Sequence, residues 1–575
     1  MSKNTLPLNS LGLKYILIEC VIMTFRTVPS VIGGNMSLGV RTSSAHVDTF
    51  ARDNLPPREQ WPELIFSLPE LNYPDRLNCI HEILDKAVLN GAGDKVAIRT
   101  YSETWTYAQL LQAVNRIAHV LIDDLAMLPG NRVLLRGANT PMMAACFLAV
   151  IKAGGIAVPT MPLLRVKELS VICEKAEITH ALCASSLRDE LDQTQQQYLP
   201  LQHVLFFNGG EDALESRMGL KSTAFAALDT SAEDVCLIGF TSGTTGKPKG
   251  TMHFHRDVMA ICDCFPRSTL KSEPNDVFIG TPPLAFTFGL GGLLLFPLRV
   301  GGTAVLLEKL TPESLLKAIA DFKATICFTA PTFYRQMTGL VSRFDLTSLR
   351  KTVSAGEALP TATREAWREA TGLLMIDGIG ATEMLHIFIS AADEYVRAGA
   401  TGQPIPGYQA CIMDDAGNLL GAGRIGRLAV KGPTGCRYLA DERQKKYVLN
   451  GWNLTGDAYL MDTDGYFWYC ARTDDMIISA GYNIAGPEVE EAILLHPAAA
   501  ECAVVGLADE ERGQIVKAFI VVRPEVNADD TLVKEIQDFV KKSIAPYKYP
   551  REIEFRTSLP RTETGKLQRF KLRTT

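Results

Sequence analysis

Residues 235–250 read VCLIGFTSGTTGKPKG and decide the fold of this 575-residue chain. An apolar segment, residues 235–240, leads into a run with three glycines, four hydroxyl side chains and two lysines, and a helix is expected from about His253. Glycines let a backbone approach a ligand closely, hydroxyl and N–H groups donate, and lysines neutralise negative charge. We therefore expect this run to bind a nucleotide triphosphate through Thr241, Ser242, Gly243, Thr244, Thr245, Gly246, Lys247 and Lys249.

Two simpler readings of this run are a flexible surface loop and a Walker-type phosphate loop. Residues rich in serine, threonine and glycine often form loops without a ligand, but here two lysines and Pro248 stand between structured segments. A Walker loop requires G-x-x-x-x-G-K-[ST]. Pro248 follows Gly246 and Lys247, and no glycine stands five residues before Gly246. The sequence therefore argues against a P-loop fold.

The composition is that of a globular protein with more than one domain. Hydrophobic residues make up 47% and charged residues 21% of the chain, and its length exceeds one ordinary domain. The net charge of −6 argues against nucleic acid as a partner. The 13 cysteines are scattered, and the C-x-C of Cys262 and Cys264 is no zinc motif. Reduced thiols and a cytoplasmic location are the simplest expectation.

The hydrophobic pattern predicts an α/β fold with largely parallel sheets. Helical spacing over residues 106–121 is followed by a strand-like stretch at 133–137, an apolar helix at 142–152 and a strand at 156–159. A helix-to-strand step covers residues 166–183, and the alternation continues to about residue 349. Such alternation is typical of layered α/β subdomains.

The pattern of predicted helices and strands changes near residue 402 and again near residue 473. Short strand-like pieces with Gly and Asp turns after residue 402 predict a small β-rich, antiparallel subdomain. Strand and helix signals then predict a small α+β C-terminal domain. We expect a probable non-structural extension over residues 1–35, a large domain over 36–473 and a mobile C-terminal domain over 474–575.

The N-terminal extension contains the apolar run YILIECVIMTF at residues 15–25. This run is too short to span a bilayer, which needs about 20 residues, and Glu19 interrupts it. A non-structural extension, such as one from an upstream translation start, is our preferred interpretation. A signal-peptide core or a membrane tether is the alternative.

Four further motifs accompany the glycine-rich run, in a fixed order along the chain. They are GATE at residues 380–383, TGD at 455–457, RTDDMI at 472–477 followed by SAGYNI at 479–484, and PRTETGK at 560–566. Each motif alone is weak, because short tripeptides occur by chance in many proteins. Five of them in this order and spacing are a strong signal of a nucleotide-using enzyme.

The chain resembles the acyl-adenylate-forming enzymes, which include acyl-CoA synthetases, adenylation domains and luciferases. The resemblance covers roughly residues 48–573. Within it, HVDTFARDNLPP (46–57), PLAFTFGLGG (283–292) and DGIGATEMLHIFIS (377–390) are most similar to the aryl-CoA ligase branch, the benzoate- and 2-aminobenzoate-CoA ligases. The resemblance implies activation of a carboxylate as acyl-AMP with release of pyrophosphate, followed by transfer to coenzyme A.

The resemblance also implies roles for residues around the phosphates and the ribose. The glycine-rich run holds the β- and γ-phosphates, Thr382 contacts the α-phosphate, and Glu383 holds Mg²⁺. Lys566, an ordinary surface lysine by position alone, bridges the substrate carboxylate and the α-phosphate. Asp457, otherwise a turn-forming Asp, accepts from the ribose hydroxyls with help from Arg472. The adenine lies along Gly356, Glu357, Ala358, Asp377, Gly378, Ile379 and Gly380, where Ile379 replaces the Tyr often found in the family.

For the second step, the family rotates its small domain about a hinge, which Asp474 matches. This rotation removes Lys566, and Ser479, Ala480 and Gly481 line the path of the thiol. The alternative for Asp474 and Asp475 is a plain exposed acidic turn.

The acyl pocket implied by the resemblance is aromatic and small, which favours a flat ring over a long flexible tail. His386 either hydrogen-bonds the substrate or is a packing residue. Phe286 stands where many acyl-CoA synthetases carry His. The set comprises Phe286, Thr287, Phe288, Ala330, Gly356, Gly378 and His386.

The leading hypothesis is an ATP-dependent aromatic acid–CoA ligase for 2-aminobenzoate or benzoate, with a possible homodimer and no expected membrane partner. Alternatives within the family are a ligase for hydroxybenzoate or a medium-chain fatty acid, and an enzyme that loads a separate carrier protein. A fused carrier is not expected after Lys566. A nucleotide-binding protein without ligase activity and a luciferase-like oxygenase are the alternatives from other classes.

Overall fold

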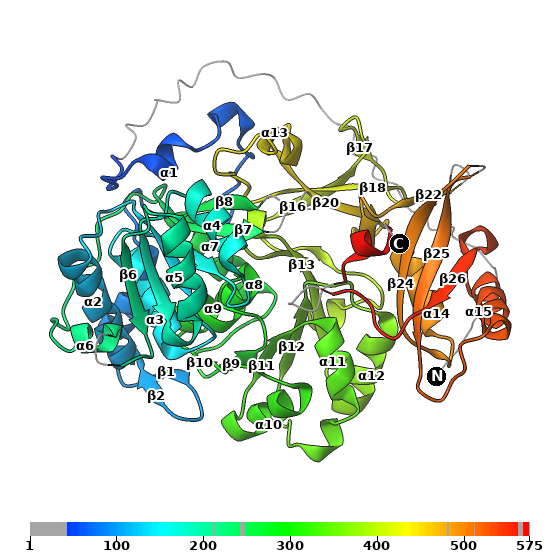
Figure 1. The fold of residues 1–575 in the computed structure, drawn as a ribbon, viewed down its shortest axis with the longest axis horizontal. Helices are drawn as coiled ribbons and strands as arrows, with labels where there is room; N and C mark the ends of the chain where they lie inside the picture. Colours follow the sequence, from blue (N-terminus) through cyan, green and yellow to red (C-terminus); the bar gives the residue numbers. More distant parts are fainter. Residues whose placement is uncertain are drawn as a thin grey trace, which may run out of the picture. The chain divides into compact units, whose positions relative to one another are not determined.

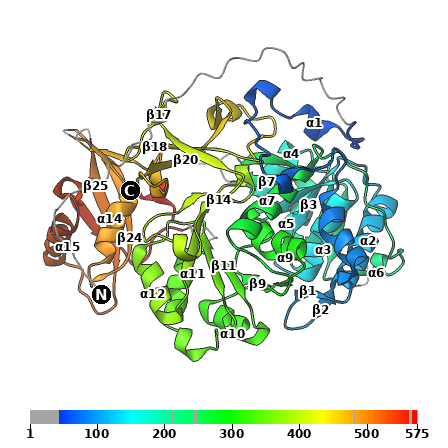
Figure 2. The ribbon, with the colours of Figure 1, turned by 180° about the vertical axis from the view of Figure 1, so that it is seen from behind.

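The computed structural model describes residues 43–210, 213–241, 248–479, 482–510, 512–561 and 567–573, apart from the side chain of Asn483. These residues belong to one compact unit, 43–575. Figure 1 shows its sheets and helices, and Figure 2 shows them from behind.

The first sheet carries the strand that enters the glycine-rich run. Its order is β6-β5-β3-β4-β7-β8, in which the first five strands pair in parallel and β7 and β8 form an antiparallel hairpin. The strands are β3 (Arg132–Arg136), β4 (Ile156–Thr160), β5 (His180–Ala184), β6 (His203–Phe207), β7 (Val235–Thr241) and β8 (Lys249–Phe254). The helices between them are α3 (Pro141–Lys152), α4 (Val166–Lys175), α5 (Arg188–Gln197) and α6 (Leu214–Met218).

The second sheet has nine strands in the order β15-β14-β13-β12-β11-β9-β10-β1-β2. The strands from β13 to β1 pair in parallel, and antiparallel strands complete both edges. The strands are β1 (Val96–Arg99), β2 (Thr104–Thr106), β9 (Val277–Gly280), β10 (Thr303–Val305), β11 (Ile326–Thr329), β12 (Lys351–Ala355), β13 (Met375–Gly380), β14 (Ile387–Ser390) and β15 (Gln403–Pro404).

Helices α10 (Pro312–Phe322), α11 (Pro331–Thr338) and α12 (Thr361–Thr371) pack beside this second sheet. Their buried side chains share one core with strand residues, so Trp367 of α12 and Tyr334 of α11 lie edge to face with ring centroids 4.9 Å apart. The other helices of this part are α1 (Phe50–Asp53), α2 (Tyr107–His119), α7 (His255–Ser268), α8 (Thr287–Leu290) and α9 (Phe296–Val300), with helical turns η3 (His81–Asp85), η4 (Val88–Ala92), η5 (Val120–Asp124), η7 (Gly291–Leu295) and η9 (Thr382–Met384).

An antiparallel sheet follows the second sheet in the chain, as the short strand-like segments after residue 402 predict. Its order is β17-β16-β18-β20-β19, and β21 also pairs with β20. The elements are β16 (Gln409–Met413), β17 (Leu419–Leu420), β18 (Ile425–Lys431), α13 (Gln444–Tyr447), β19 (Val448–Leu449), β20 (Trp452–Met461) and β21 (Phe467–Arg472).

The C-terminal segment has the α+β character predicted from the sequence. Strands β24 and β25 are antiparallel and β26 joins β25 in parallel, while β22 and β23 form a separate pair. The elements are β22 (Ile477–Ser479), β23 (Tyr482–Ile484), α14 (Gly486–Leu494), β24 (Ala499–Asp509), β25 (Gly513–Val522), α15 (Asp530–Ser543), β26 (Glu552–Phe555) and η12 (Arg569–Leu572). The expected domain joint near residue 473 stays a prediction.

Local sequence explains the helices that the periodicity predicts. Helix α2 begins with a capping box, in which the Thr106 hydroxyl accepts from the Gln109 N–H at 3.2 Å and the Gln109 side chain accepts from the Thr106 N–H at 2.8 Å. Helix α3 begins at Pro141, where a missing N–H costs no helix bond.

The helix expected from about His253 begins two residues further along the chain. Residues 249–254 form strand β8, and α7 begins at His255. Strand β8 has the sequence KGTMHF, in which polar residues stand at every second position. It pairs with β7, so that Thr241 lies opposite Lys249. The glycine-rich run is therefore the connection of a β-hairpin.

Candidate active site

The hairpin β7–β8 brings the two ends of the glycine-rich run together. Thr241 ends β7, and Lys249 begins β8 directly opposite it. The residues between them that were predicted to bind phosphate lie outside the described residues, and their roles stay predictions: Ser242, Gly243, Thr244, Thr245, Gly246 and Lys247. The fold thus presents this run from two paired strands.

The GATE motif packs directly on this hairpin. A Cβ atom added to Gly239 of β7 would lie 2.9 Å from the Thr382 methyl group, so only glycine fits this close approach. The His253 side chain of β8 donates from Nε2 to the Thr382 carbonyl oxygen at 2.8 Å. Two motifs that lie 140 residues apart in the sequence are therefore adjacent, which places Thr382 beside the glycine-rich run.

A buried carboxylate and a buried phenol meet a half-buried ammonium group next to Thr382. The Tyr438 hydroxyl donates to Oε1 of Glu383, and Lys249 Nζ lies 3.8 Å from the same oxygen. Lys249 Nζ also donates to the Tyr438 hydroxyl at 3.0 Å. Burial and the nearby charge of Glu383 raise the pKa of Tyr438, so it stays a neutral donor. The structure thus unites predicted residues Lys249 and Glu383 and adds Tyr438, which the sequence analysis missed.

Tyr438 is held in place by main-chain pairing with β8. The Met252 N–H donates to the Arg437 carbonyl and the Leu439 N–H to the Gly250 carbonyl, each at 2.8 Å. The fully buried Arg437 guanidinium donates to the carboxylate of Asp257 on α7. Burial would raise the pKa of Asp257, but the charges of Arg437 and Arg256 and the contact with His253 together outweigh it, and the pKa is lowered. This buried ion pair fixes the segment that carries Tyr438.

The residues around Glu383 fit a magnesium ion that binds together with substrate phosphates. Mg²⁺ is usually held by one or two carboxylates plus phosphate oxygens and water, rather than by a cage of protein groups. Within the described part of the chain, Glu383 belongs to no group of three or more clustered His, Cys, Asp or Glu donors. A single buried carboxylate beside the run that is predicted to bind phosphate matches this type of site.

The predicted ribose contacts face each other across a strand pair. Asp457 of β20 lies opposite Arg472 of β21, and Arg472 Nη1 donates to Asp457 Oδ1 at 3.0 Å. Burial raises the pKa of Asp457, although Arg472 opposes this. Burial would lower the pKa of Arg472, but the charge and hydrogen bond of Asp457 and the charge of Asp474 together outweigh it, and the pKa is raised. Asp474 lies 3.7 Å from Arg472 Nε, so the expected hinge residue adjoins this pair.

The predicted adenine and acyl residues come from one edge of the second sheet. Neighbouring parallel strands β9, β11, β12 and β13 end just before or within these residues. Carboxyl ends of parallel strands meet at one edge, where open α/β sheets bind ligands. The residues at this edge are Phe286, Thr287, Phe288, Ala330, Gly356, Glu357, Ala358, Asp377, Gly378, Ile379 and Gly380.

Gly356 and Glu357 have clear local roles at this edge. Gly356 follows β12 with φ +90°, a left-handed conformation that favours glycine. The Glu357 carboxylate accepts from the Thr332 hydroxyl at 2.7 Å and from its N–H at 3.3 Å, at the start of α11. A carboxylate is stabilised at a helix N-terminus, so the Glu357 side chain shapes the edge that the adenine is predicted to contact.

Asp377 is an acid with an unusual proton affinity. Burial raises its pKa to about 7, although Arg364 Nη2 lies 3.8 Å from its carboxylate and opposes the shift. The folded protein therefore holds a proton that the unfolded chain releases, and Asp377 makes the ligand-free fold less stable as the pH rises from about 4 to about 7.

We expect Asp377→Asn to remove this pH dependence. The difference in unfolding free energy between the variant and the native protein should shift by about 2–4 kcal/mol in favour of the variant as the pH rises from about 4.5 to about 8. This magnitude follows because one pKa unit corresponds to about 1.4 kcal/mol. Urea unfolding of both ligand-free proteins at the two pH values measures the difference. A constant difference across this range would show that Asp377 titrates normally.

His386 lies inside an aromatic cluster at the same edge. Its ring centroid is 4.5 Å from that of Phe296, 5.6 Å from that of Phe265 and 5.8 Å from that of Phe288. Burial lowers the pKa of His386 to about 3, and the nearby Phe288 main chain offsets little of this. Neither ring nitrogen makes a hydrogen bond of normal geometry in the structure. His386 is thus a neutral imidazole with unused donor and acceptor capacity.

Two glycines that the sequence analysis did not select make room for this cluster. A Cβ on Gly291 would lie 2.4 Å from His386 Cδ2, and one on Gly292 would lie 2.7 Å from the Phe328 ring. The close approach of η7 to the rings thus depends on these glycines. The prediction that Phe288 and His386 share a site agrees with their contact, while the roles of Phe286, Thr287 and Ala330 stay predictions.

The remaining predicted residues belong to the C-terminal segment. Ser479 is buried at the end of β22, where its hydroxyl accepts from Arg512 Nε at 3.5 Å. Lys566, Ala480 and Gly481 lie outside the described residues, and their roles stay predictions.

Comparison with known proteins identifies the family. The AMP-binding enzyme model matches residues 85–438, and the AMP-binding enzyme C-terminal domain model matches residues 488–566. The chain therefore belongs to the AMP-binding enzyme family, as the five motifs predict.

Relatives and solved structures agree with this assignment. The benzoate–CoA ligase of Thauera aromatica is 35% identical over 88% of this chain and 97% of its own. The structure of the anthranilate CoA ligase AuaEII in complex with anthranoyl-AMP has a TM-score of 0.83 at 34% identity, covering 88% of this chain and 98% of its own. A benzoate CoA ligase from Burkholderia xenovorans LB400 has a TM-score of 0.79 at 30% identity, covering 86% and 100%. The resemblance to the aryl-CoA ligase branch is confirmed.

The structure also bears on the predictions made for the cysteines and for a membrane-spanning segment. All twelve cysteines in the described part of the chain are free thiols. No helix among the described residues combines the length and apolar character needed to cross a membrane.

Proposed function

We propose that this protein is an ATP-dependent acid–CoA ligase for an aromatic carboxylate, 2-aminobenzoate or benzoate. The observation that carries the substrate class is the buried, neutral His386 among phenylalanine rings, at the edge where four parallel strands end. Aromatic walls favour a flat ring, and an unpaired imidazole can hydrogen-bond one polar group on it. The names of the similar proteins support the same substrate class.

In the first step, the carboxylate oxygen attacks the α-phosphorus of ATP, and pyrophosphate leaves. This step brings an anion to a polyanion, and two unit charges about 4 Å apart repel by about 4 kcal/mol at an effective dielectric of about 20. Lys566 and Thr382 offset this repulsion at the α-phosphate, while the glycine-rich run holds the departing phosphates. Glu383 would hold Mg²⁺, which would neutralise charge on the phosphates. Asp457 and Arg472 hold the ribose.

In the second step, the thiol of coenzyme A attacks the acyl carbon of acyl-AMP, and AMP leaves as the thioester forms. We propose that the C-terminal domain turns about Asp474 between the steps, which withdraws Lys566 and brings Ser479, Ala480 and Gly481 to the thiol path. A hinge of this kind needs conformational change at only a few residues. A cytoplasmic location and a homodimer stay predictions.

A coupled pyrophosphate assay across a panel of acids tests the substrate class. Benzoate, its amino and hydroxy derivatives and medium-chain fatty acids are compared by kcat/KM. Because one methylene is worth only about 1–3 kcal/mol in a pocket, close relatives of the true substrate should also react. A clear preference for medium-chain acids would refute the aromatic assignment. Transfer of the acyl group from acyl-AMP to the thiol of a carrier protein in place of coenzyme A, with release of AMP, would support the alternative acceptor.

Replacing His386 by Leu distinguishes its two interpretations. If His386 bonds a ring substituent, we expect kcat/KM for 2-aminobenzoate to fall about 10- to 100-fold, the loss of about 1–3 kcal/mol for a buried hydrogen bond. The value for benzoate should change much less. Equal losses for both acids would show that His386 only packs in the cluster, and thermal melting of the variant checks that the fold is intact.

A further inference from the structure

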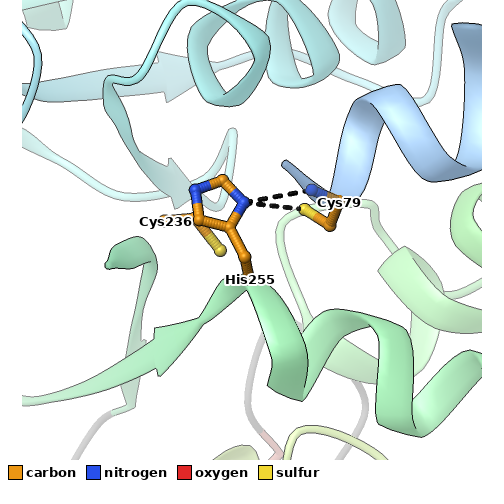
Figure 3. A group of neighbouring side chains, drawn as sticks. All are labelled: Cys79, Cys236 and His255. Atoms are coloured by element: carbon orange, nitrogen blue, oxygen red, sulfur yellow. Dashed lines mark hydrogen bonds between the residues drawn. The ribbon is translucent and has the colours of Figure 1, made fainter. Parts of the chain in front are cut away.

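A second cluster of reactive side chains lies outside the proposed active site. Cys79, Cys236 and His255 come from three separate parts of the chain, and all three side chains are buried. One ligand atom from each lies within 4.8 Å of the others. Figure 3 shows the Cys79 sulfur beside a ring nitrogen of His255 and the Cys236 sulfur below the ring. Within the described part of the chain, no other group of three such donors is this compact.

The geometry of His255 presents a nitrogen lone pair to a sulfur atom. The Cys79 N–H donates to His255 Nδ1 at 3.2 Å, so Nδ1 carries no proton, and a metal ion at Nδ1 would replace this hydrogen bond. The Cys79 Sγ lies 3.3 Å from the same nitrogen. A zinc ion with bonds of about 2.3 Å to sulfur and about 2.1 Å to nitrogen separates its tetrahedral ligands by about 3.6 Å. The distance from Cys79 Sγ to His255 Nδ1 is a few tenths of an ångström shorter than this value, and the separations that involve Cys236 are no longer than 4.8 Å.

The local backbone directs these three side chains toward one point. Cys79 opens a helix that Asn78 caps, since the Asn78 side chain accepts from the Ile80 N–H at 3.2 Å. The register of β7 and β8 shifts between Val235 and Leu237, so Cys236 is the extra residue of a bulge. Bulges re-aim side chains and are treated as built features of a fold. His255 follows β8 and begins α7.

Zinc binds the thiolate form of cysteine rather than the thiol, so both thiols have to ionise when the metal ion binds.

We propose that Cys79, Cys236 and His255 form a binding site for a thiophilic divalent cation of the zinc type. Two thiolates neutralise the double charge, which suits a buried position, and a water molecule takes the fourth tetrahedral position. Binding releases the remaining thiol protons. Because Cys236 is the second residue of β7 and His255 directly follows β8, the ion fastens the open end of this hairpin to the helix that begins at Cys79.

Cobalt(II) is the probe for this site. One equivalent of Co²⁺ is added to the full-length, metal-free protein in a reductant without thiols, and the absorption spectrum is recorded. We expect thiolate-to-cobalt charge-transfer bands and tetrahedral d–d bands, both removed by one equivalent of Zn²⁺. Cys79→Ser and Cys236→Ser should weaken binding by at least the roughly 10- to 100-fold that loss of an outer-shell partner costs.

Two controls keep the test decisive. Cys146→Ala removes another fully buried thiol from the same core and should leave the cobalt spectrum unchanged. If the cluster variants do not fold, alkylation of the native protein replaces them, and Zn²⁺ should slow labelling of Cys79 and Cys236 but not of Cys146. Absence of charge-transfer bands at one equivalent, an unchanged spectrum in Cys79→Ser, or a Cys79–Cys236 disulfide in the freshly purified protein would overturn the proposal.

Discussion

Lys566→Ala is expected to abolish acyl-adenylate formation while leaving thioester formation from supplied acyl-AMP nearly intact. The lysine is proposed to contact the carboxylate and the α-phosphate only in the first step. Loss of one preorganised group at a developing charge typically costs about 10²- to 10³-fold in rate. Acid-dependent pyrophosphate release measures the first half-reaction, and conversion of synthetic acyl-AMP with coenzyme A measures the second.

Lys542→Ala is the matched control for this experiment. Lys542 is an exposed lysine near the end of α15 in the same C-terminal segment, and its removal should change neither half-reaction. Equal losses in both half-reactions of Lys566→Ala would contradict the account in which the C-terminal domain serves the two steps in different positions.

The second large effect is expected on stability, from Asp257→Asn. Asp257 and Arg437 are both fully buried and pair with each other. Removing the carboxylate leaves a buried guanidinium without its counter-charge, which costs about 3–5 kcal/mol in such pairs. Urea unfolding of the ligand-free variant measures the loss, and ATP binding should weaken as well, because Arg437 precedes Tyr438 in the segment beside Glu383.

Two further variants isolate the buried charge as the cause. Asp257→Leu combined with Arg437→Met removes both charges, and we expect it to be more stable than Asp257→Asn alone. Asp345→Asn breaks the exposed pair with Lys323 and should hardly change stability. If the double variant is less stable than the single one, the uncompensated charge is not the main cost.

The sequence predicts most of the elements but fewer of their contacts. Helix α2 and strand β4 follow from local periodicity, which depends only on residues close in sequence. Strand β8 does not, because its identity depends on pairing with β7, and His253 at its end reads equally well as the start of α7. Only the pairing shows that His253 supports the Thr382 carbonyl.

Some residues of the candidate site can be predicted from the sequence, and others are found only in the structure. Glu383, Asp457 and Arg472 stand in motifs and are recognisable from the sequence, and the register of β20 and β21 then places Asp457 opposite Arg472. Tyr438 stands in no motif that signals its contact with Glu383. No sequence pattern predicts the cluster of Cys79, Cys236 and His255 either. The three residues lie far apart along the chain and do not have the spacing of metal ligands.

The most direct test of the central claim is identification of the products formed by the pure protein from ATP and an aromatic acid. Without coenzyme A, we expect 2-aminobenzoate or benzoate to give bound acyl-AMP and one equivalent of pyrophosphate. With coenzyme A, we expect one equivalent each of aryl-CoA, AMP and pyrophosphate by mass spectrometry. Release of ADP and phosphate, or pyrophosphate release that does not depend on an aromatic acid, would contradict the account.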